Sequence, residues 1–396
     1  MNNASLKRIL LHGARLILPD AEVERGAVLI EDGRVREVFS GDDAGGARVD
    51  DQIDLSGLTL FPGFIDIHIH GAVGVDTLAA TAANLDRVSQ FLATQGVTGW
   101  LPTLVPGSAE DYAQAVAAIG EANNAVGARV LGVHYEGPFV NFHQCGALRQ
   151  QFFRTYSGAS DVDDLPQLAD KYARHLMTLA PEIEGGIELV RELRRRNWIV
   201  SIGHTRAGFA VLDEALTAGA HHMTHFMNAM GPLHHRSPGP IGWGLGHDDV
   251  TCDVIADGVH LDQEMLRLLL KLKSAERLTL ISDAIAAAGR GDGSYEIWEQ
   301  TITVKDGRTS NAAGSIAGSV ISMLDAVRVM KSVGASEVEL ARMAATNPAR
   351  LLGIDHDCGT IEAGKRADLV ALDLNGNSAL TVIGGQVVFD DRKSSA

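Results

Sequence analysis

Between residues 62 and 350, short apolar runs alternate with longer stretches in which apolar positions recur with the period of a helix. This alternation is typical of a parallel α/β architecture, either a closed barrel or a doubly wound sheet. Residues 142–175 have weaker periodicity, and we expect a long excursion there. The runs that predict strands are FIDIHIH, GWLPTLV, RVLGVHYEG, WIVSIGHT, HHMTHF, TCDVIADG and LTLISDA. The stretches that predict helices include AANLDRVSQFLATQG, GGIELVRELRRRN, AVLDEALTAG and LDQEMLRLLLKLK.

The two ends of the chain have a different pattern, in which β-rich runs are separated by turns rich in Gly, Asn and Asp. The dipeptide Asp32-Gly33 lies between two such runs and predicts a β-hairpin. We therefore expect residues 1–61 and 351–396 to meet in one small β-sandwich domain. Residues 62–350 are expected to form the α/β domain.

Polar and ionisable side chains cluster where the predicted strands end, before the loops that lead to the helices. In a (β/α)8 barrel all strand C-termini meet at one face, so residues more than about 200 positions apart come together. In a doubly wound sheet the same number of strand ends would be spread along one edge of the sheet. We therefore predict a (β/α)8 TIM-like barrel whose mouth gathers His68, His70, Glu136, His204, His225, His260 and Asp283.

Five of these side chains are of the metal-ligand type. His68 and His70 alternate with isoleucines, so both imidazoles lie on one face of a strand and can share a cation. Any one of these residues alone could be a hydrogen-bonded histidine of the core or an acid in a surface salt bridge. Together they are hard to explain by core packing, which disfavours polar groups without partners. The sequence therefore predicts a divalent metal site formed by Glu136, His204, His225, His68 and His70.

Asp283 ends another apolar run. A carboxylate beside a metal can accept the proton of an attacking water and pass it to a leaving amine. The alternative for an isolated Asp is a helix N-cap. We predict the general acid/base role on the condition that the metal site exists.

The charge balance restricts the possible partners. The chain has 34 Lys and Arg against 50 Asp and Glu, which gives −16 and argues against nucleic acid or an anionic membrane. An anionic small substrate would need a local basic contact. Three cysteines form no disulfide framework, and no apolar run approaches the ~20 residues that cross a bilayer. Because a signal-peptide pattern is also missing, we expect a cytoplasmic protein.

Taken in order, the motifs resemble the amidohydrolase superfamily and, within it, the N-acetylglucosamine-6-phosphate deacetylase family. The matching segments extend over nearly the whole chain. They are PGFIDIHIHGAVGVD, GVTGWLPTLV, HYEGPFVN, LAPE, SIGHT, THFMNAM, HHRSPG, DGVH, SDAIAAAG, AGS, NPARLLG and GTIEAGKRADLVALD.

The resemblance implies roles for the candidate residues. The principal metal would be held by Glu136, His204 and His225, and His68 and His70 would add a second site. One or two divalent ions per subunit are implied, with zinc as the first choice and iron, manganese or cobalt as alternatives. Asp283 would be the catalytic acid/base. The substrate contacts would come from Asn228, Ala229, His260 and Arg236, the last reaching a 6-phosphate from the neighbouring subunit of a homodimer.

Leu148 departs from the family's pattern, because a substrate-contacting His is expected at this position. This difference affects none of the predicted metal ligands, so we expect the hydrolytic reaction to be retained. It leaves the identity of the sugar substrate undecided. The sequence thus predicts a metal-dependent hydrolase that removes acetate from an N-acetylated hexosamine 6-phosphate in amino-sugar catabolism. The alternatives are an amidohydrolase for N-acyl amino acids or cyclic amides and, more remotely, a non-catalytic scaffold.

Overall fold

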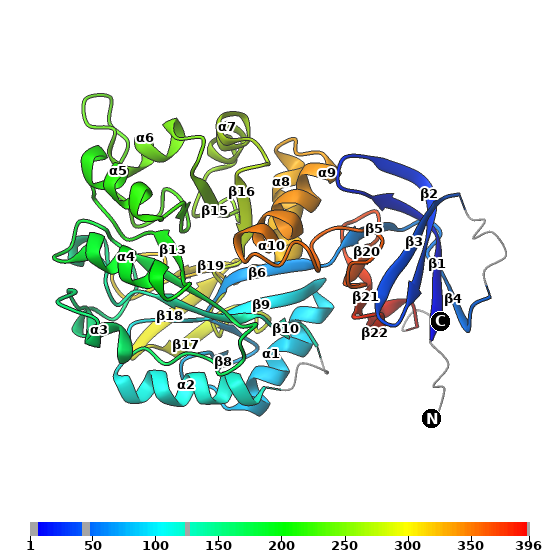
Figure 1. The fold of residues 1–396 in the computed structure, drawn as a ribbon, viewed down its shortest axis with the longest axis horizontal. Helices are drawn as coiled ribbons and strands as arrows, with labels where there is room; N and C mark the ends of the chain where they lie inside the picture. The colour runs from blue at the N-terminus through cyan, green and yellow to red at the C-terminus, as the bar shows by residue number, and fades with distance from the viewer. Residues whose placement is uncertain (1–6, 42–47, 123–126, 394–396) are drawn as a thin grey trace.

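A barrel of parallel strands lies beside a separate mixed sheet in the computed structural model, which describes residues 7–41, 48–122 and 127–393 (Figure 1). In the described chain, eight strands pair in parallel around the barrel, and a parallel bridge between Ile69 and Ala284 joins the last strand to the first. The predicted barrel is confirmed. Its strands are β6 (Phe64–Ile69), β9 (Val97–Leu104), β11 (Gly132–Glu136), β12 (Arg174–Leu179), β13 (Ile199–Ile202), β14 (His222–Met223), β15 (Thr251–Ile255) and β16 (Leu278–Ile281).

Helices follow the strands and cover the outside of the barrel (Figure 1). The four predicted helices begin and end within two residues of the predicted stretches. Local signals fix their starts: the side chain of Thr81 caps α1, and the side chain of Asp262 caps α7. The main helices are α1 (Ala82–Thr94), α2 (Ala109–Glu121), α4 (Gly186–Arg195), α5 (Phe209–Ala218), α6 (Gly239–Gly246), α7 (Gln263–Lys273) and α8 (Met323–Ser332).

One barrel strand was not predicted. The sequence of β12, RHLMTL, contains a single β-branched residue, so its strand propensity is weak. Between β11 and β12 the chain forms the expected excursion, which contains only the short helices η1 (Phe142–Gln144), η2 (Gln150–Phe152) and α3 (Ser160–Asp163) in this described stretch.

The second sheet combines strands from both ends of the chain. Its order is β22-β21-β20-β5-β1-β2-β3, with β4 also paired to β1, so β5 lies between an N-terminal strand and a C-terminal one. Asp32 and Gly33 have φ of 51° and 74° and join β2 to β3, which confirms the predicted hairpin. The strands are β1 (Arg8–Ile17), β2 (Glu22–Glu31), β3 (Arg34–Ser40), β4 (Asp51–Asp54), β5 (Thr59–Pro62), β20 (Leu369–Leu372), β21 (Ser378–Ile383) and β22 (Gln386–Asp390).

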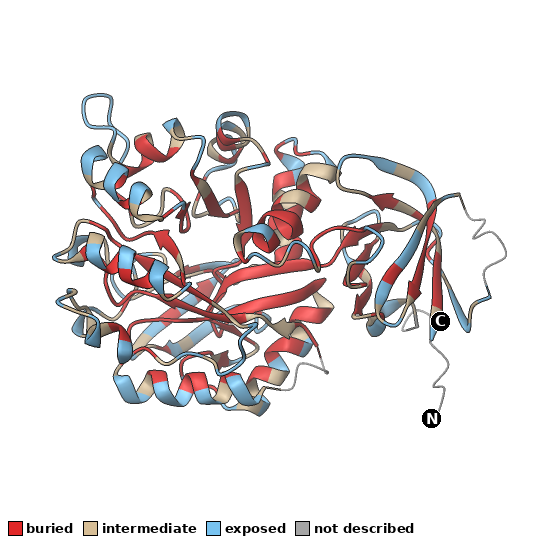
Figure 2. Ribbon diagram, viewed as in Figure 1, coloured by how far each residue is buried: buried red, intermediate tan, exposed pale blue. Residues whose placement is uncertain are grey.

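The barrel strands are buried along most of their length (Figure 2). Every residue of β6 and of β9 is buried, as expected for parallel strands that are covered on both faces. The few ionisable groups in such strands therefore need partners inside the protein. In the described residues, no helix has the length and apolar character to cross a membrane.

Candidate metal centre

The five predicted ligand side chains lie at the C-terminal ends of four barrel strands. His68 lies in β6, and His70 directly follows it. Glu136 is the last residue of β11, while His204 and His225 are each the second residue after β13 and β14. All five residues are at most 4% exposed. The barrel thus brings together groups that are up to about 160 positions apart in the chain.

Three residues at these strand ends have a left-handed backbone. The φ angles of His204, His225 and Asp283 are 48°, 30° and 48°. Such values are uncommon outside glycine and cost about 1–3 kcal/mol each, and they cluster at functional sites. In each case the residue lies two positions after the end of its strand, and its side chain is buried in the mouth of the barrel.

The ligand-type atoms converge on the carboxylate of Glu136. Its Oε1 lies 2.9 Å from Nε2 of both His204 and His225, and these two nitrogens are 3.1 Å apart. Its Oε2 lies 3.1 Å from Nε2 of His70, which is 3.2 Å from Nε2 of His68. Ligand atoms around a tetrahedral cation are about 3.3 Å apart. Glu136 therefore belongs to two groups of residues that could each hold a metal ion. One group includes His204 and His225, and the other includes His68 and His70.

Hydrogen bonds at the other ring nitrogen fix two of these imidazoles. Nδ1 of His204 lies 2.7 Å from the carbonyl oxygen of Gln144, and Nδ1 of His70 lies 3.2 Å from that of Thr103. Because a carbonyl only accepts, Nδ1 carries the proton in both rings. In the neutral imidazoles Nε2 then presents a lone pair toward Glu136. This arrangement fits a cation and is typical of metal-binding histidines.

The electrostatics of the cluster also favour a cation. Burial opposes charge on His70, but hydrogen bonds with Asp283 and Glu136 outweigh it and raise its pKa to about 10. For His225 burial is again outweighed, chiefly by Glu136, and the pKa rises to about 9. The pKa of Glu136 lies well below its usual value despite burial, because positive charge on His68 and hydrogen bonds from His204 and His225 stabilise the carboxylate. A bound metal ion would replace these protons.

Asp283 lies beside the same cluster. Its Oδ1 is 3.5 Å from Nε2 of His68 and 3.4 Å from Nε2 of His70. Burial disfavours its charged form, but the charge of His68 and the hydrogen bond with His70 outweigh burial and lower its pKa. The alternative N-cap role is wrong, because the next described helix, α8, is capped by Ser322. The lowered pKa keeps Asp283 in its ionised form beside the cluster.

Two buried acids that the sequence analysis missed hold the strand ends in place. Asp66 accepts the hydroxyl of Ser282 at 2.5 Å and the backbone N–H of His68 at 3.2 Å. Burial raises the pKa of Asp66 to about 6, against the opposing hydrogen bond from Ser282. Asp253 accepts the backbone N–H of His225 through a short hydrogen bond. The available signal was a carboxylate inside an otherwise apolar run, in FIDIHIH and in TCDVIADG.

The cluster opens into a cavity of about 200 Å³ that also contains three of the predicted substrate contacts, Asn228, Ala229 and His260. The ring of His260 is fixed by Asp257, whose Oδ2 lies 2.7 Å from Nδ1. The larger apolar side chains of the wall are those of Leu148, Ile255, Trp298 and Ile316.

Trp298 comes from an antiparallel sheet that the sequence analysis did not predict. It lies in the turn between β17 (Gly293–Ile297) and β18 (Gln300–Lys305), and β19 (Arg308–Ser310) completes the sheet. Its indole N–H donates to Asp76 at 2.7 Å, and its ring contacts the ring of His70 at 5.1 Å between centroids.

The structure does not bring Arg236 into this cavity. Arg236 is exposed on the loop between Met230 and α6, and its backbone N–H donates to Nδ1 of His234. The described residues that line the cavity include no Lys or Arg. An anionic group away from the metal-ligand cluster would therefore find no Lys or Arg in this wall.

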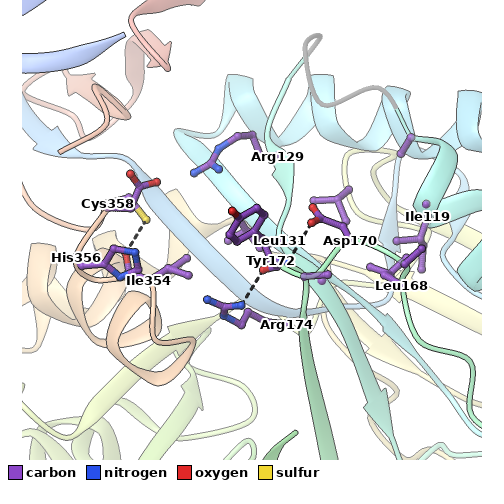
Figure 3. Close-up of a pocket in the computed structure, with 17 residues that line it drawn as sticks. Ile119, Arg129, Leu131, Leu168, Asp170, Tyr172, Arg174, Ile354, His356 and Cys358 are labelled. Atoms are coloured by element: carbon purple, nitrogen blue, oxygen red, sulfur yellow. Dashed lines mark hydrogen bonds between the residues drawn. The ribbon is translucent and has the colours of Figure 1, made fainter. Parts of the chain in front are cut away.

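A larger cavity, of about 530 Å³, lies near the N-terminal ends of β10 (Arg129–Val130), β11 and β12 (Figure 3). Its arginines are already engaged: Arg129 pairs with Asp368 at 2.9 Å, and Arg174 donates to the carbonyl of Leu352 at 2.7 Å. In barrel enzymes the chemistry lies at the C-terminal face. The smaller cavity at the metal-ligand cluster is therefore the candidate site.

Comparison with known proteins agrees with this architecture. The amidohydrolase family model matches residues 59–388. The N-acetylglucosamine-6-phosphate deacetylase of Bacillus subtilis is 35% identical over 399 residues and is matched over 98% of both chains. The N-acetylgalactosamine-6-phosphate deacetylase of Escherichia coli O157:H7 is 36% identical over 319 residues, which cover 79% of this chain and 83% of that one.

Among solved structures, the N-acetylglucosamine-6-phosphate deacetylase of Thermotoga maritima has a TM-score of 0.85 and 35% identity, covering 96% of this chain and 99% of that chain. The chain belongs to the amidohydrolase family. Within this family it is a member of the N-acetylglucosamine-6-phosphate deacetylase group, as the resemblance of its motifs implied.

Proposed function

We propose that this protein removes acetate from an N-acetylated hexosamine 6-phosphate, either N-acetylglucosamine 6-phosphate or a close relative. The observation that carries the proposal is the convergence of Glu136, His204 and His225 at the barrel mouth, beside the ionised Asp283. The relatives support the substrate class, and a deacetylase from Mycobacterium smegmatis, 30% identical, has been solved in complex with N-acetyl-D-glucosamine-6-phosphate.

We assign the principal metal to Glu136, His204 and His225, with His68 and His70 completing a second position. Imidazole and carboxylate donors suit zinc, our first choice, as well as iron, manganese or cobalt. When bound, the cation supplies Lewis-acid polarisation of the scissile amide carbonyl and lowers the pKa of the attacking water.

The protein's own groups handle the proton. Asp283 accepts a proton from the water whose oxygen bonds to the carbonyl carbon. It then delivers that proton to the amine nitrogen as the C–N bond breaks, so acetate and a free amino sugar are released. His260, oriented by Asp257, and Asn228 hold the substrate at the cavity wall.

We further propose a homodimer in which Arg236 of one subunit reaches the phosphate bound by its neighbour. Arg236 is exposed, and the described cavity wall contains no Lys or Arg. In a chain with a net charge of −16, a phosphate needs a specific cationic contact, and a guanidinium provides two parallel hydrogen bonds. A cytoplasmic setting fits the three free cysteines.

The phosphate assignment predicts the behaviour of the variant Arg236→Ala. Its KM for a 6-phosphorylated N-acetylhexosamine should rise about 10- to 100-fold, because a hydrogen bond to a charged group is worth about 1.5–3 kcal/mol. Turnover of the unphosphorylated sugar should stay almost unchanged. Steady-state deacetylation of matched sugars with and without the 6-phosphate measures both effects.

The exposed Arg350 on α10 (Asn347–Leu351) provides the matched control, and Arg350→Ala should leave both values unchanged. Equal hydrolysis of phosphorylated and plain sugars by the parent enzyme would contradict the assignment. Neutral N-acyl compounds are the second candidate, favoured by the lack of Lys and Arg among the described residues that line the cavity, and would then become the leading substrates.

Leu148 should influence the choice of sugar. It is 6% exposed and lines the cavity, where it offers no hydrogen bond. Leu148→His should raise kcat/KM for N-acetylglucosamine 6-phosphate about 3- to 10-fold, the value of one ordinary hydrogen bond. Leu148→Met, which keeps the volume without adding a donor, is the control. If the His and Met variants have the same kcat/KM, Leu148 does not contact the sugar.

A further inference from the structure

Glu182 joins two loops at the mouth of the barrel. It lies three residues after β12, and its carboxylate accepts three hydrogen bonds from neutral donors. Oε1 accepts from Nδ2 of Asn141 at 2.8 Å and from the backbone N–H of Arg206 at 2.7 Å. Oε2 accepts the hydroxyl of Thr205 at 2.6 Å. Asn141 belongs to the loop after β11, while Thr205 and Arg206 belong to the loop after β13.

The first loop reaches the metal centre through Gln144. The backbone N–H of Asn141 donates to the carbonyl of His204 at 3.0 Å, and that of Gln144 donates to the carbonyl of Asn141 at 2.9 Å. The carbonyl of Gln144 in turn accepts from Nδ1 of His204 at 2.7 Å. This tight turn therefore sets the direction in which Nε2 of His204 points. Glu182 holds the start of the turn through the side chain of Asn141.

The second loop reaches the substrate side of the cavity. The backbone N–H of Thr205 donates to the carbonyl of Ala229 at 3.2 Å, and the carbonyl of Thr205 accepts from Gly231 at 3.0 Å. The hydroxyl of Thr205, which donates to Glu182, also accepts the N–H of Ala207 at 3.0 Å. Thr205 is thus fixed on both sides and supports the segment that carries Asn228 and Ala229.

We propose that Glu182 is a positioning residue that couples the metal centre to the substrate loop, an inference that rests on the hydrolytic function proposed above. Its hydrogen bond from Asn141, the Asn141 arm, orients His204 for the metal. Its hydrogen bond from Thr205, the Thr205 arm, places the Asn228–Ala229 segment. Glu182 itself belongs neither to the metal-ligand cluster nor to the described lining of the cavity. Outer partners that hydrogen-bond a metal ligand directly are worth about 10- to 100-fold in metal affinity. Glu182 acts on His204 through such a partner, because it holds the turn that presents the Gln144 carbonyl.

The variant Glu182→Ala removes both arms. We expect its metal affinity, measured by competition with a chelator in the absence of substrate, to fall about 10- to 100-fold. Glu339→Ala is the matched control, because Glu339 is also half-buried and accepts a backbone N–H and a hydroxyl, both from Ser336 at 2.8 Å. That carboxylate caps α9 (Glu337–Ala341) and should leave metal affinity unchanged while lowering stability.

Two milder variants separate the arms. Asn141→Ser keeps an oxygen that can cap η1 but is too short to reach Glu182, so metal affinity should fall about 10-fold with little change in KM. Thr205→Val keeps the shape and loses the hydroxyl, so KM should rise about 3- to 10-fold with little change in metal affinity. A purely structural role would shift the melting temperature of both variants without this split.

Metal affinity within about 2-fold of the parent in folded Glu182→Ala would overturn the inference. If that variant does not fold, the Asn141 and Thr205 variants decide, and identical effects of the two on metal affinity and KM would overturn it. A parent enzyme that binds metal yet deacetylates no sugar would refute the proposed function instead. The affinity series, measured without substrate, would then still test the role of Glu182.

Discussion

Replacing Asp283 with Asn should lower kcat about 10²- to 10⁴-fold, the usual worth of general acid/base catalysis, while the metal stays bound. Asn is nearly isosteric and tolerates the left-handed backbone at this position, where φ is 48°. It cannot take up a proton, however, so the water is not activated and the amine is not protonated. Steady-state kinetics on preparations with equal metal content measure the loss.

Asp262→Asn is the control for that substitution, because Asp262 is an exposed carboxylate that caps α7 and Asn caps helices equally well. Its kcat should match that of the parent. A near-normal kcat in Asp283→Asn would move the acid/base role to another group of the cluster.

Replacing Glu136 with Gln should weaken metal binding more than about 100-fold, since even the outer partners of a metal site are worth 10- to 100-fold. Both oxygens of Glu136 face ligand-type nitrogens, at 2.9 Å and 3.1 Å. Gln offers one neutral oxygen and directs an amide N–H₂ at the other set. Metal analysis after dialysis against a chelator should find about one equivalent or more in the parent and almost none in the variant.

Glu276→Gln, at an exposed position between the end of α7 and the start of β16, should retain the parent's metal content. Retention of metal by Glu136→Gln would place the principal ion elsewhere. Loss of metal from both variants would indicate a general effect on the fold rather than on the ligand set.

The barrel and its centre could be predicted because periodicity and chemistry agree in this chain. Strands buried on both faces must be apolar, so His68, Glu136 and Asp283 stood out where the runs end. Their convergence followed from barrel geometry alone. His260 was expected at the mouth from the same pattern, whereas the positions of Asn228 and Ala229 at the cavity came from the family resemblance rather than from any pattern of apolar residues.

What could not be predicted depends on tertiary context. β12 has little intrinsic strand propensity and is a strand because its neighbours pair with it on both sides. Trp298 reaches the site through a turn whose partner, Asp76, is more than 200 positions away. Glu182 has ordinary spacing in the sequence, and only the meeting of two loops at its carboxylate shows its importance. Long-range partners of this kind leave no local signal.

The interleaved sheet has a consequence for the order in which the protein is made. β5 pairs with β1 on one side and with β20 on the other, about 300 residues later in the chain. At about 5–20 residues per second, a ribosome needs about 15–60 s to supply that partner. During this interval the apolar edge of β5 is unpaired and needs shelter, while the barrel strands emerge in spatial order and can pair with their neighbours at once. The mixed sheet is therefore the last part of the molecule to close, although most of its strands precede the barrel.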